Sequence, residues 1–446
     1  MTLLALEVLF MDWWLVLLII FGGLVVLMMT GLPVAFSFML INLLGVYILW
    51  GGHSGLQQLI LSIFESVTFF ALLPVPLFIL MGDLLFQSGM GSRMLDALDK
   101  ALGRLPGRLS LVAISGGLLV AVLCGNTWAS TAMLGAMLVP EMKKRGYKNP
   151  MALGPIMGGG ALAIIIPPSG MAVVLATLAG ISVGELLIAG LIPGLVMAGF
   201  FAAYIIGRCI LQPDMAPAYS VEHLHVHARF MPLLKHVAPL GVIVFSVIGL
   251  MLLGFATPSE AAAFGVLATF ALAFLYRSLS WQIVKKSFAS TMSTTTMIFM
   301  IFCGSTAFSQ ILSFSGASKG MVNFAVALPV PPLVLLICIM LVVMILGMFM
   351  DQLSILMITL PVFMPVCAAL HWDTLWFGLM LLINMSIANL SPPFGIELFV
   401  MKAVSPPDTT MADIYRASVP FIIIEALVIL LVMFVPPIAT WLPRTM

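Results

Sequence analysis

Long hydrophobic blocks alternate with short polar segments along most of the chain. A helix needs about 20 apolar residues to cross the hydrocarbon of a bilayer. The blocks that reach or approach this length lie at 13–30, 34–50, 71–90, 189–211, 236–254, 259–277, 292–313 and 418–441. This pattern predicts an all-α polytopic membrane protein.

Two further apolar blocks, 109–142 and 332–369, are interrupted near their middles by the sequences CGNTW and LGMFMD. Each arm then has about 15 residues, which at 1.5 Å per residue is too short to cross roughly 30 Å of hydrocarbon. We therefore predict two re-entrant helical hairpins, each turning at a tip inside the membrane and leaving on the side it entered.

The blocks 151–181 and 373–404 are too long for one span, and each contains a Pro-Pro pair. A proline inside a helix removes a backbone hydrogen bond and costs about 3 kcal/mol. Irregular backbone at membrane depth persists only where it is buried in protein or lines a polar cavity. We predict that each block is a single crossing with an unwound middle, and that freed carbonyls there can bind a cation while half-helix N-termini face an anion.

The interruptions recur with a common spacing. The interval from Gly82 to Gly125 equals the interval from Gly304 to Gly347, and a Pro-Pro pair follows at a similar distance in both cases. The chain therefore divides into a first repeat, 1–211, with hairpin 109–142 and broken helix 151–181, a cytoplasmic linker, 212–235, and a second repeat, 236–446, with hairpin 332–369 and broken helix 373–404. The three histidines of the linker are explained by solvation rather than by a metal site: His223, His225 and His227.

Positive charge predicts the orientation of the two repeats. Basic clusters at 93–108 and 143–148 flank the first hairpin, and the excess of Lys and Arg in cytoplasmic loops places both inside. When the predicted membrane crossings are followed along the chain, only Lys319 and Arg444 of the 18 basic residues fall on the outside. Both termini also fall on the outside. The two hairpins then open to opposite sides, so the repeats are inverted, as in many secondary transporters. Amphipathic segments near 92–104 and 280–290 are expected to lie along the cytoplasmic interface.

Composition narrows the class of function. The chain is 62% hydrophobic and 8% charged, whereas soluble domains carry about 25% charge. A net charge of +1 provides no basic surface for nucleic acid, and the five cysteines are expected to be small buried hydrophobes. A membrane-embedded enzyme lacks support, because no metal-ligand cluster or nucleophile–base pair occurs at mid-depth. A channel is disfavoured because inverted halves with proline-broken crossings favour alternating access.

The candidate site residues border the four interruptions. At the tips, hydroxyl and amide oxygens suit a hard monovalent cation, with helix capping and packing as the alternative, and an intramembrane carboxylate is a functional candidate. The candidates for substrate or ion binding are Asn126, Thr127, Ser130, Pro167, Pro168, Ser169, Gly347, Asp351, Asn389, Ser391, Pro392 and Gly395. Three acids in or near spans, Asp83, Glu397 and Glu425, are at least as readily explained by structural pairing.

Five runs of the chain form a recognisable set of motifs. They are GNTWASTAMLGAMLVPEMKKRGY, GGGALAIIIPPSG and GISVGELLIAGLIPG in the first half, and GMFMDQLSILMITLPVFMPV and SPPFGIELFV in the second. Together these runs resemble the DctM-like large membrane subunit of tripartite ATP-independent periplasmic (TRAP) transporters. The resemblance covers nearly the whole chain, and the order and spacing of these motifs make it specific.

The resemblance implies an elevator transporter in the bacterial inner membrane, without a cofactor, that uses a sodium gradient to take up a small organic anion such as a carboxylate. It also implies two protein partners, a small four-helix membrane subunit (DctQ-like) and a periplasmic solute-binding protein (DctP-like), besides membrane lipid. The expected sodium ligands are Asn126, Thr127, Pro167, Gly347 and Ser391. The alternative is a stand-alone sodium- or proton-coupled carboxylate carrier of the same superfamily.

Overall fold

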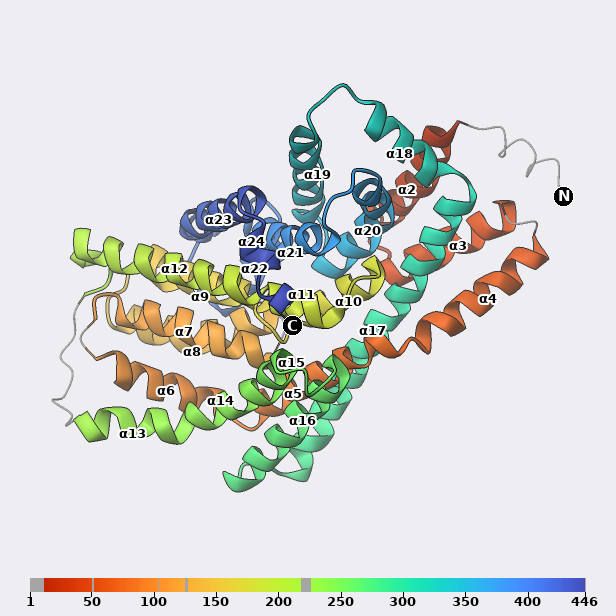
Figure 1. Cartoon of the computed structure of the whole chain (residues 1–446). Coiled ribbons are helices and arrows are strands. Elements are labelled where there is room, and N and C mark those ends of the chain that lie inside the picture. Colours follow the sequence, from red (N-terminus) through yellow and green to blue (C-terminus); the bar gives the residue numbers. More distant parts are fainter. Residues whose placement is uncertain (1–11, 50–51, 104, 125–126, 218–225, 446) are drawn as a thin grey trace.

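The structure is a computed structural model that describes residues 12–49, 52–103, 105–124, 127–217 and 226–445. Asn126, His223 and His225 lie outside these residues. Throughout the described ranges the regular structure is helical (Figure 1). The α-helices are α2 (Trp13–Met29), α3 (Val34–Leu49), α4 (His53–Val67), α5 (Pro74–Gln87), α6 (Met90–Leu102), α7 (Arg108–Cys124), α8 (Thr127–Lys144), α9 (Asn149–Ala161), α10 (Gly170–Ala179), α11 (Val183–Ala189), α12 (Leu191–Leu211), α13 (Val226–His236), α14 (Ala238–Val244), α15 (Leu250–Leu252), α16 (Pro258–Leu275), α17 (Trp281–Phe314), α18 (Ala317–Ala327), α19 (Pro332–Gly347), α20 (Gln352–Ala369), α21 (Thr374–Leu390), α22 (Ile396–Val404), α23 (Met411–Phe434) and α24 (Pro437–Thr440).

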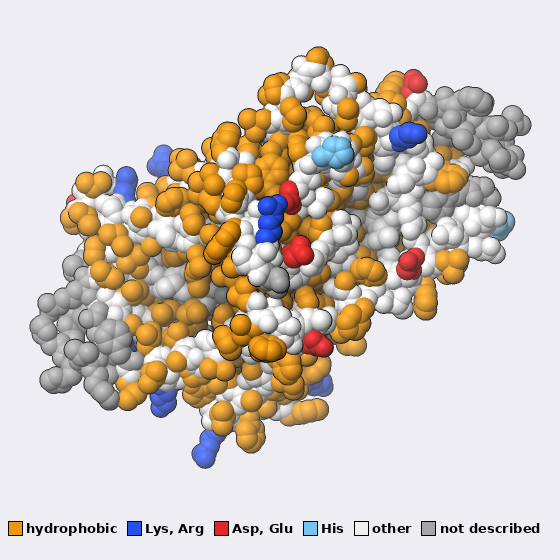
Figure 2. All heavy atoms as spheres, in the orientation of Figure 1, with side chains coloured by type: hydrophobic (Ala, Val, Ile, Leu, Met, Phe, Trp, Pro, Cys, Tyr) orange, Lys and Arg blue, Asp and Glu red, His pale blue; other side chains and the backbone are white. Residues whose placement is uncertain are grey.

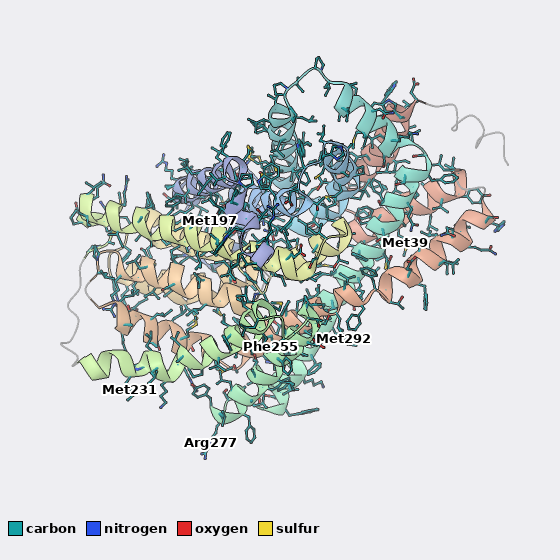
Figure 3. All side chains as sticks on the ribbon, in the orientation of Figure 1. Met39, Met197, Met231, Phe255, Arg277 and Met292 are labelled. Atoms are coloured by element: carbon teal, nitrogen blue, oxygen red, sulfur yellow. The ribbon has the colours of Figure 1, made fainter. Side chains whose placement is uncertain are left out.

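Hydrophobic side chains are spread over the face shown in Figure 2, and Lys, Arg, Asp and Glu side chains are few. Among the described residues, seven helical segments are long and apolar enough to cross a membrane. Large apolar side chains such as Met39, Phe255 and Met292 are exposed on three different segments (Figure 3). A chain that turns so much apolar surface outward is stable only in lipid, so the membrane class predicted from the pattern is confirmed.

Each half of the chain contains two packed helices, which we call a hairpin, followed by a helix with an unwound middle. In the first half, the hairpin α7–α8 packs on α9, and an unwound segment separates α9 from α10. In the second half, α19–α20 packs on α21, and an unwound segment separates α21 from α22. The contacts also cross between the halves, since α8 packs on α22 and α20 packs on α10. We call α7–α12 together with α19–α24 the core unit, and the other α-helices the outer helices.

Glycines allow the helices of the core unit to approach closely. A Cβ on Gly117 of α7 would lie 2.5 Å from the Cα of Gly159 on α9, so the two backbones touch at this point. Small residues permit such crossings in membrane proteins, where packing rather than hydrophobic burial drives association. The two broken helices also meet, because the Ser386 hydroxyl donates to the Ala161 carbonyl at 3.5 Å.

The arms of the hairpins are longer than the sequence predicted. The helices α7, α8, α19 and α20 have 17, 18, 16 and 18 residues, and α20 is itself long and apolar enough to cross a membrane. The estimate of about 15 residues was low by one to three residues, because the helices continue past the predicted apolar arms; α8, for example, ends at Lys144. The hairpin shape is present, and its re-entry into the membrane stays a prediction.

The long helix α17 corrects two expectations. We predicted a span at 292–313 and a separate interfacial segment near 280–290, but Trp281–Phe314 is one continuous helix of 34 residues. No proline or glycine occurs in its first 20 residues, so nothing local ends the helix between the two segments. The expected amphipathic segment near 92–104 is found as α6, which packs on α13.

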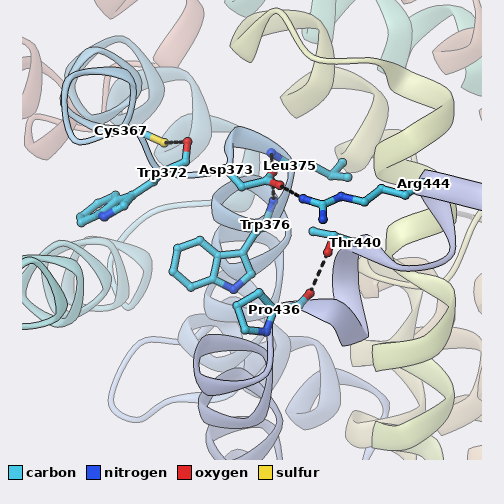
Figure 4. A network of polar contacts seen from close by, with 8 residues as sticks. All are labelled: Cys367, Trp372, Asp373, Leu375, Trp376, Pro436, Thr440 and Arg444. Atoms are coloured by element: carbon cyan, nitrogen blue, oxygen red, sulfur yellow. Dashed lines mark hydrogen bonds and ion pairs between the residues drawn. The ribbon is translucent and has the colours of Figure 1, made fainter.

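The end of the chain is attached to the start of the second broken helix. Asp373 accepts hydrogen bonds from the backbone N–H groups of Leu375 and Trp376, at 2.9 and 3.2 Å, and caps α21. Its other carboxylate oxygen pairs with Arg444 at 3.2 Å, as Figure 4 shows.

In Figure 1 the outer helices run along the lower and right edges of the core unit.

Candidate functional site

A cavity of about 850 Å³ lies between the core unit and the outer helices. Three of the four interruptions contribute to its lining. These are the first hairpin tip with Trp128 and Ala129, the helix start after the first Pro-Pro pair with Gly170 and Met171, and the second tip with Asp351 and Gln352. The outer helices α5 and α17 close the cavity with Asp83, Phe86, Ser290 and Thr294, among others. Its volume is within the range of small-molecule sites.

The first break is an unwound segment between η2 (Leu162–Ile164) and α10, and it contains Pro167 and Pro168. Ser169 ends it, because its Oγ donates to the Ile164 carbonyl at 2.8 Å and accepts the Ala172 N–H at 3.2 Å, capping α10. The carbonyls of Pro167 and Pro168 accept no hydrogen bond from any described residue. Free carbonyls and a capped helix N-terminus thus lie side by side, which offers partners for both a cation and an anion.

The second break, 391–395, contains Pro392 and does not line the cavity. Its carbonyls are partly engaged, since Ser391 O accepts the Gly395 N–H at 3.1 Å and Pro393 O accepts the Tyr415 hydroxyl at 2.8 Å. The Phe394 ring lies against Phe349 of the second tip, with centroids 5.4 Å apart.

The second tip packs on the helix that leads into the second break. A Cβ on Gly347 would lie 2.4 Å from the Cβ of Ala388, so this contact requires glycine. The next residue, Asn389, is fully buried, and neither polar atom of its side chain has a hydrogen-bond partner among the described residues. Ser391 donates to the Ile387 carbonyl at 2.7 Å. An unpartnered buried amide is costly, and it marks a place where a ligand would be stabilising.

The predicted residues of the two hairpin tips lie in different surroundings. Thr127 and Ser130 are buried within the first hairpin. Asp351 caps α20, where it accepts hydrogen bonds from the backbone N–H and the hydroxyl of Ser354, and it also lines the cavity. Both interpretations of Asp351, as a cap and as a site residue, therefore describe part of its environment.

Of the predicted site residues that the structure describes, only Asp351 lines the cavity, and Asp83 and Trp128 are two polar lining residues that were not predicted. Asp83 accepts a hydrogen bond from Thr291 at 3.4 Å across α5 and α17, and it takes part in no ion pair in the described part of the chain. The sequence could have marked Asp83 as a site candidate, because it is a single acid inside an apolar block. Trp128 belongs to the tip motif itself. No group of three or more His, Cys, Asp or Glu side chains suited to a metal ion occurs among the described residues.

A cavity bounded by hairpin tips and a broken helix, inside an apolar helical body, defines a membrane transport protein of the carrier class. The family model described as "Tripartite ATP-independent periplasmic transporter, DctM component" matches residues 21–438. The chain belongs to this family. It is therefore the large permease of a TRAP transporter, a multi-pass protein of the inner membrane and not an enzyme, as the resemblance implied.

Curated relatives agree with this assignment. The C4-dicarboxylate TRAP transporter large permease DctM of Pseudomonas aeruginosa is 29% identical over 391 residues, 87% of this chain and 90% of the relative. The ectoine permease TeaC of Halomonas elongata is 27% identical over 417 residues, covering 93% and 96%. The 2,3-diketo-L-gulonate permease YiaN of Escherichia coli is 27% identical over 414 residues, covering 91% and 94%.

Two solved structures share the fold. The YdaH transporter of Alcanivorax borkumensis superposes with a TM-score of 0.62 at 17% identity, over 86% of this chain and 90% of that one. The antimetabolite efflux protein MtrF of Neisseria gonorrhoeae gives 0.59 at 15% identity, over 87% and 85%. At such identity the likeness concerns the fold alone.

Proposed function

We propose that this permease takes up a small organic anion, driven by a sodium gradient, through an elevator movement of the core unit against the outer helices. The observation that carries the proposal is the cavity at the boundary between these two sets of helices, lined by both tips and by the start of α10. The names of two relatives give C4-dicarboxylates and 2,3-diketo-L-gulonate as their substrates, and both are small organic anions.

The electrostatics of the cavity favour an anion that enters together with cations. The first-turn N–H groups of α10 and its helix dipole favour negative charge near Gly170. However, the lining includes the carboxylates of Asp83 and Asp351 and no Lys, Arg or His side chain among the described residues. In a site of low dielectric constant, an anion beside two carboxylates needs compensating positive charge. Bound sodium ions would supply that charge, which is the physical basis for coupling.

The breaks offer oxygen ligands suited to sodium. In the first half, the Pro167 and Pro168 carbonyls accept no described hydrogen bond. In the second half, the buried side-chain oxygen of Asn389 is unpartnered, and it lies two residues before Ser391. These groups, with Thr127 in the first half and Gly347 in the second, would hold the ions. Hard monovalent cations prefer such neutral oxygens, and partial dehydration makes each contact count.

The order of elements supports the inverted-repeat arrangement. The hairpin, broken helix and crossed contacts of the first half each have a counterpart in the second. An inverted pair of this kind gives two related conformations that expose one site to opposite sides in turn. The family also implies two partners for this chain, a small membrane subunit and a periplasmic protein that delivers the substrate.

Reconstitution tests this function. The purified chain is placed in liposomes with or without a small membrane subunit of the same transporter family, and a periplasmic binding protein of that family is added outside with radiolabelled succinate. We expect accumulation only with both partners and an inward sodium gradient. Accumulation by the chain alone would favour a stand-alone carrier, and accumulation with the partners but independent of sodium would contradict the coupling.

A further inference from the structure

Two glutamates are fully buried in the core unit and do not line the transport cavity. Glu397 lies in the first turn of α22, and Glu425 lies near the middle of α23. Both side chains are 0% exposed. Neither is needed by the substrate and sodium sites proposed above, so their burial requires a separate explanation.

The pair has few partners for its four carboxyl oxygens. The Thr131 hydroxyl, on α8, donates to Oε1 of Glu397 at 2.5 Å. The second oxygen of Glu397 and both oxygens of Glu425 accept no hydrogen bond from the described residues. The nearby Ser386 hydroxyl donates to the Ala161 carbonyl instead. The helices that carry the two glutamates, α22 and α23, pack on each other, and both pack on α9.

In the described part of the chain, no basic side chain is recorded in an ion pair with either acid. The ion pairs recorded among the described residues involve other groups. The helices packed on α22 and α23 carry further titratable side chains, and none of these is recorded in a hydrogen bond or ion pair with either glutamate. They are Glu141, Lys143 and Lys144 on α8, Lys402 on α22, Asp413, Tyr415 and Arg416 on α23, and Tyr204, Arg208 and Cys209 on α12.

Close packing surrounds the contact between Thr131 and Glu397. A Cβ on Gly160 of α9 would lie 1.9 Å from Oγ1 of Thr131 and 2.7 Å from Oε1 of Glu397. The hydroxyl–carboxyl contact is therefore pressed against the backbone of α9. Two buried carboxylates without compensating charge are strongly destabilised, whereas a proton converts one acceptor into a donor and removes one of the two charges.

We propose that Glu397 and Glu425 form a proton-binding site that holds at least one proton at neutral pH and joins α8, α22 and α23. With that proton in place, one carboxyl becomes a hydrogen-bond donor inside the pair, while Thr131 donates from the first hairpin. The site thereby links the second arm of the first hairpin to the helix that follows the second break. Its occupancy depends on neither the substrate nor the partner proteins.

Infrared difference spectroscopy tests this site on the purified full-length chain in lipid nanodiscs at neutral pH. The spectrum of the variant carrying Glu397→Gln and Glu425→Gln is subtracted from that of the unmodified chain. We expect this difference spectrum to contain the C=O stretching band of a protonated carboxylic acid, because the unmodified chain has the band and the double variant lacks it. The matched control Glu185→Gln, at an exposed glutamate of α11, should retain the band.

A difference that contains only ionised-carboxylate bands would overturn the proposal. So would an acid band that disappears when sodium replaces potassium at constant ionic strength, since the pair would then bind a metal cation. If the double variant does not fold, Thr131→Val and Thr131→Ser keep both acids. The valine variant should shift the acid band and the serine variant should not, whereas an unmoved band in Thr131→Val would refute the assignment.

Discussion

The two Pro-Pro breaks have the same local chemistry but different surroundings. At the first break, every residue from Ile165 to Ser169 is buried, and the proline carbonyls are unbonded within the described structure. At the second break, Pro393 and Phe394 are exposed, Phe394 by 50%, and the Pro393 carbonyl is bonded to Tyr415. Only the first break leads directly into a helix that lines the cavity.

The neighbouring helices explain this difference. The junction between α11 and α12 covers the first break, since a Cβ on Gly190, the residue just before α12, would lie 2.1 Å from the Ile165 carbonyl oxygen. The second break has one aromatic cover, Phe349 of the second tip, which leaves Phe394 half exposed. A pair of repeats with similar sequence features therefore gives one enclosed and one accessible interruption. If the core unit moves as an elevator, as proposed, this difference in enclosure between the two breaks would belong to one of its two conformations.

The largest expected effect concerns the prolines of the first break. Replacing Pro167 and Pro168 together with alanine should let the helix close and use the free carbonyls. Removing a helix-breaking proline favours the closed helix by about 3 kcal/mol, which corresponds to roughly a hundredfold loss of the open form. We expect a comparable loss of sodium-dependent uptake in the reconstituted system. The matched variant at Pro392 and Pro393 should lose less, and equal losses would remove the distinction between the breaks.

Chemical labelling measures the accessibility of the two breaks. In a background without the five native cysteines, Phe394→Cys should react with a water-soluble maleimide at least about tenfold faster than Ser169→Cys. The buried site reacts only after local opening, and each tenfold corresponds to about 1.4 kcal/mol. Similar rates in nanodiscs would show that the first break is open in the membrane.

Packing against the first break should be sensitive to small changes. Gly190→Ala places a methyl group against the Ile165 carbonyl, so we expect a destabilisation of about 1–3 kcal/mol, typical of overpacking. Gly199→Ala, inside α12, is the control, because a Cβ there meets nothing within 4 Å. Thermal unfolding in detergent measures both variants, and an unchanged midpoint for Gly190→Ala would contradict the tight enclosure.

The smallest effect is expected at the tyrosine that bonds the second break. Tyr415→Phe removes the hydroxyl that donates to Pro393 O and should cost about 1 kcal/mol. Tyr47→Phe, at an exposed tyrosine of α3, should leave the unfolding midpoint unchanged. If Tyr415→Phe also leaves the midpoint unchanged, the carbonyls of the two breaks are energetically equivalent.

Local sequence was enough to find the hairpins and both interruptions. Proline lacks a backbone N–H and clashes with the preceding turn, so a Pro-Pro pair ends a helix whatever surrounds it. Lengths were less certain, because a helix can continue past its apolar residues, as α8 does to Lys144. The same limit applies to α17, whose polar first turns gave no sign that they join the apolar span.

The sequence by itself determined the membrane class, the order of the elements and the positions where helices break, because each follows from the hydrophobicity and backbone chemistry of neighbouring residues. Only the tertiary structure decided which interruptions share a cavity and which acids meet. Asp83 and Thr291 are 208 positions apart, and Thr131 and Glu397 are 266 apart. Contacts over such distances depend on how whole helices pack, and the residues between them carry no local pattern that records the pairing.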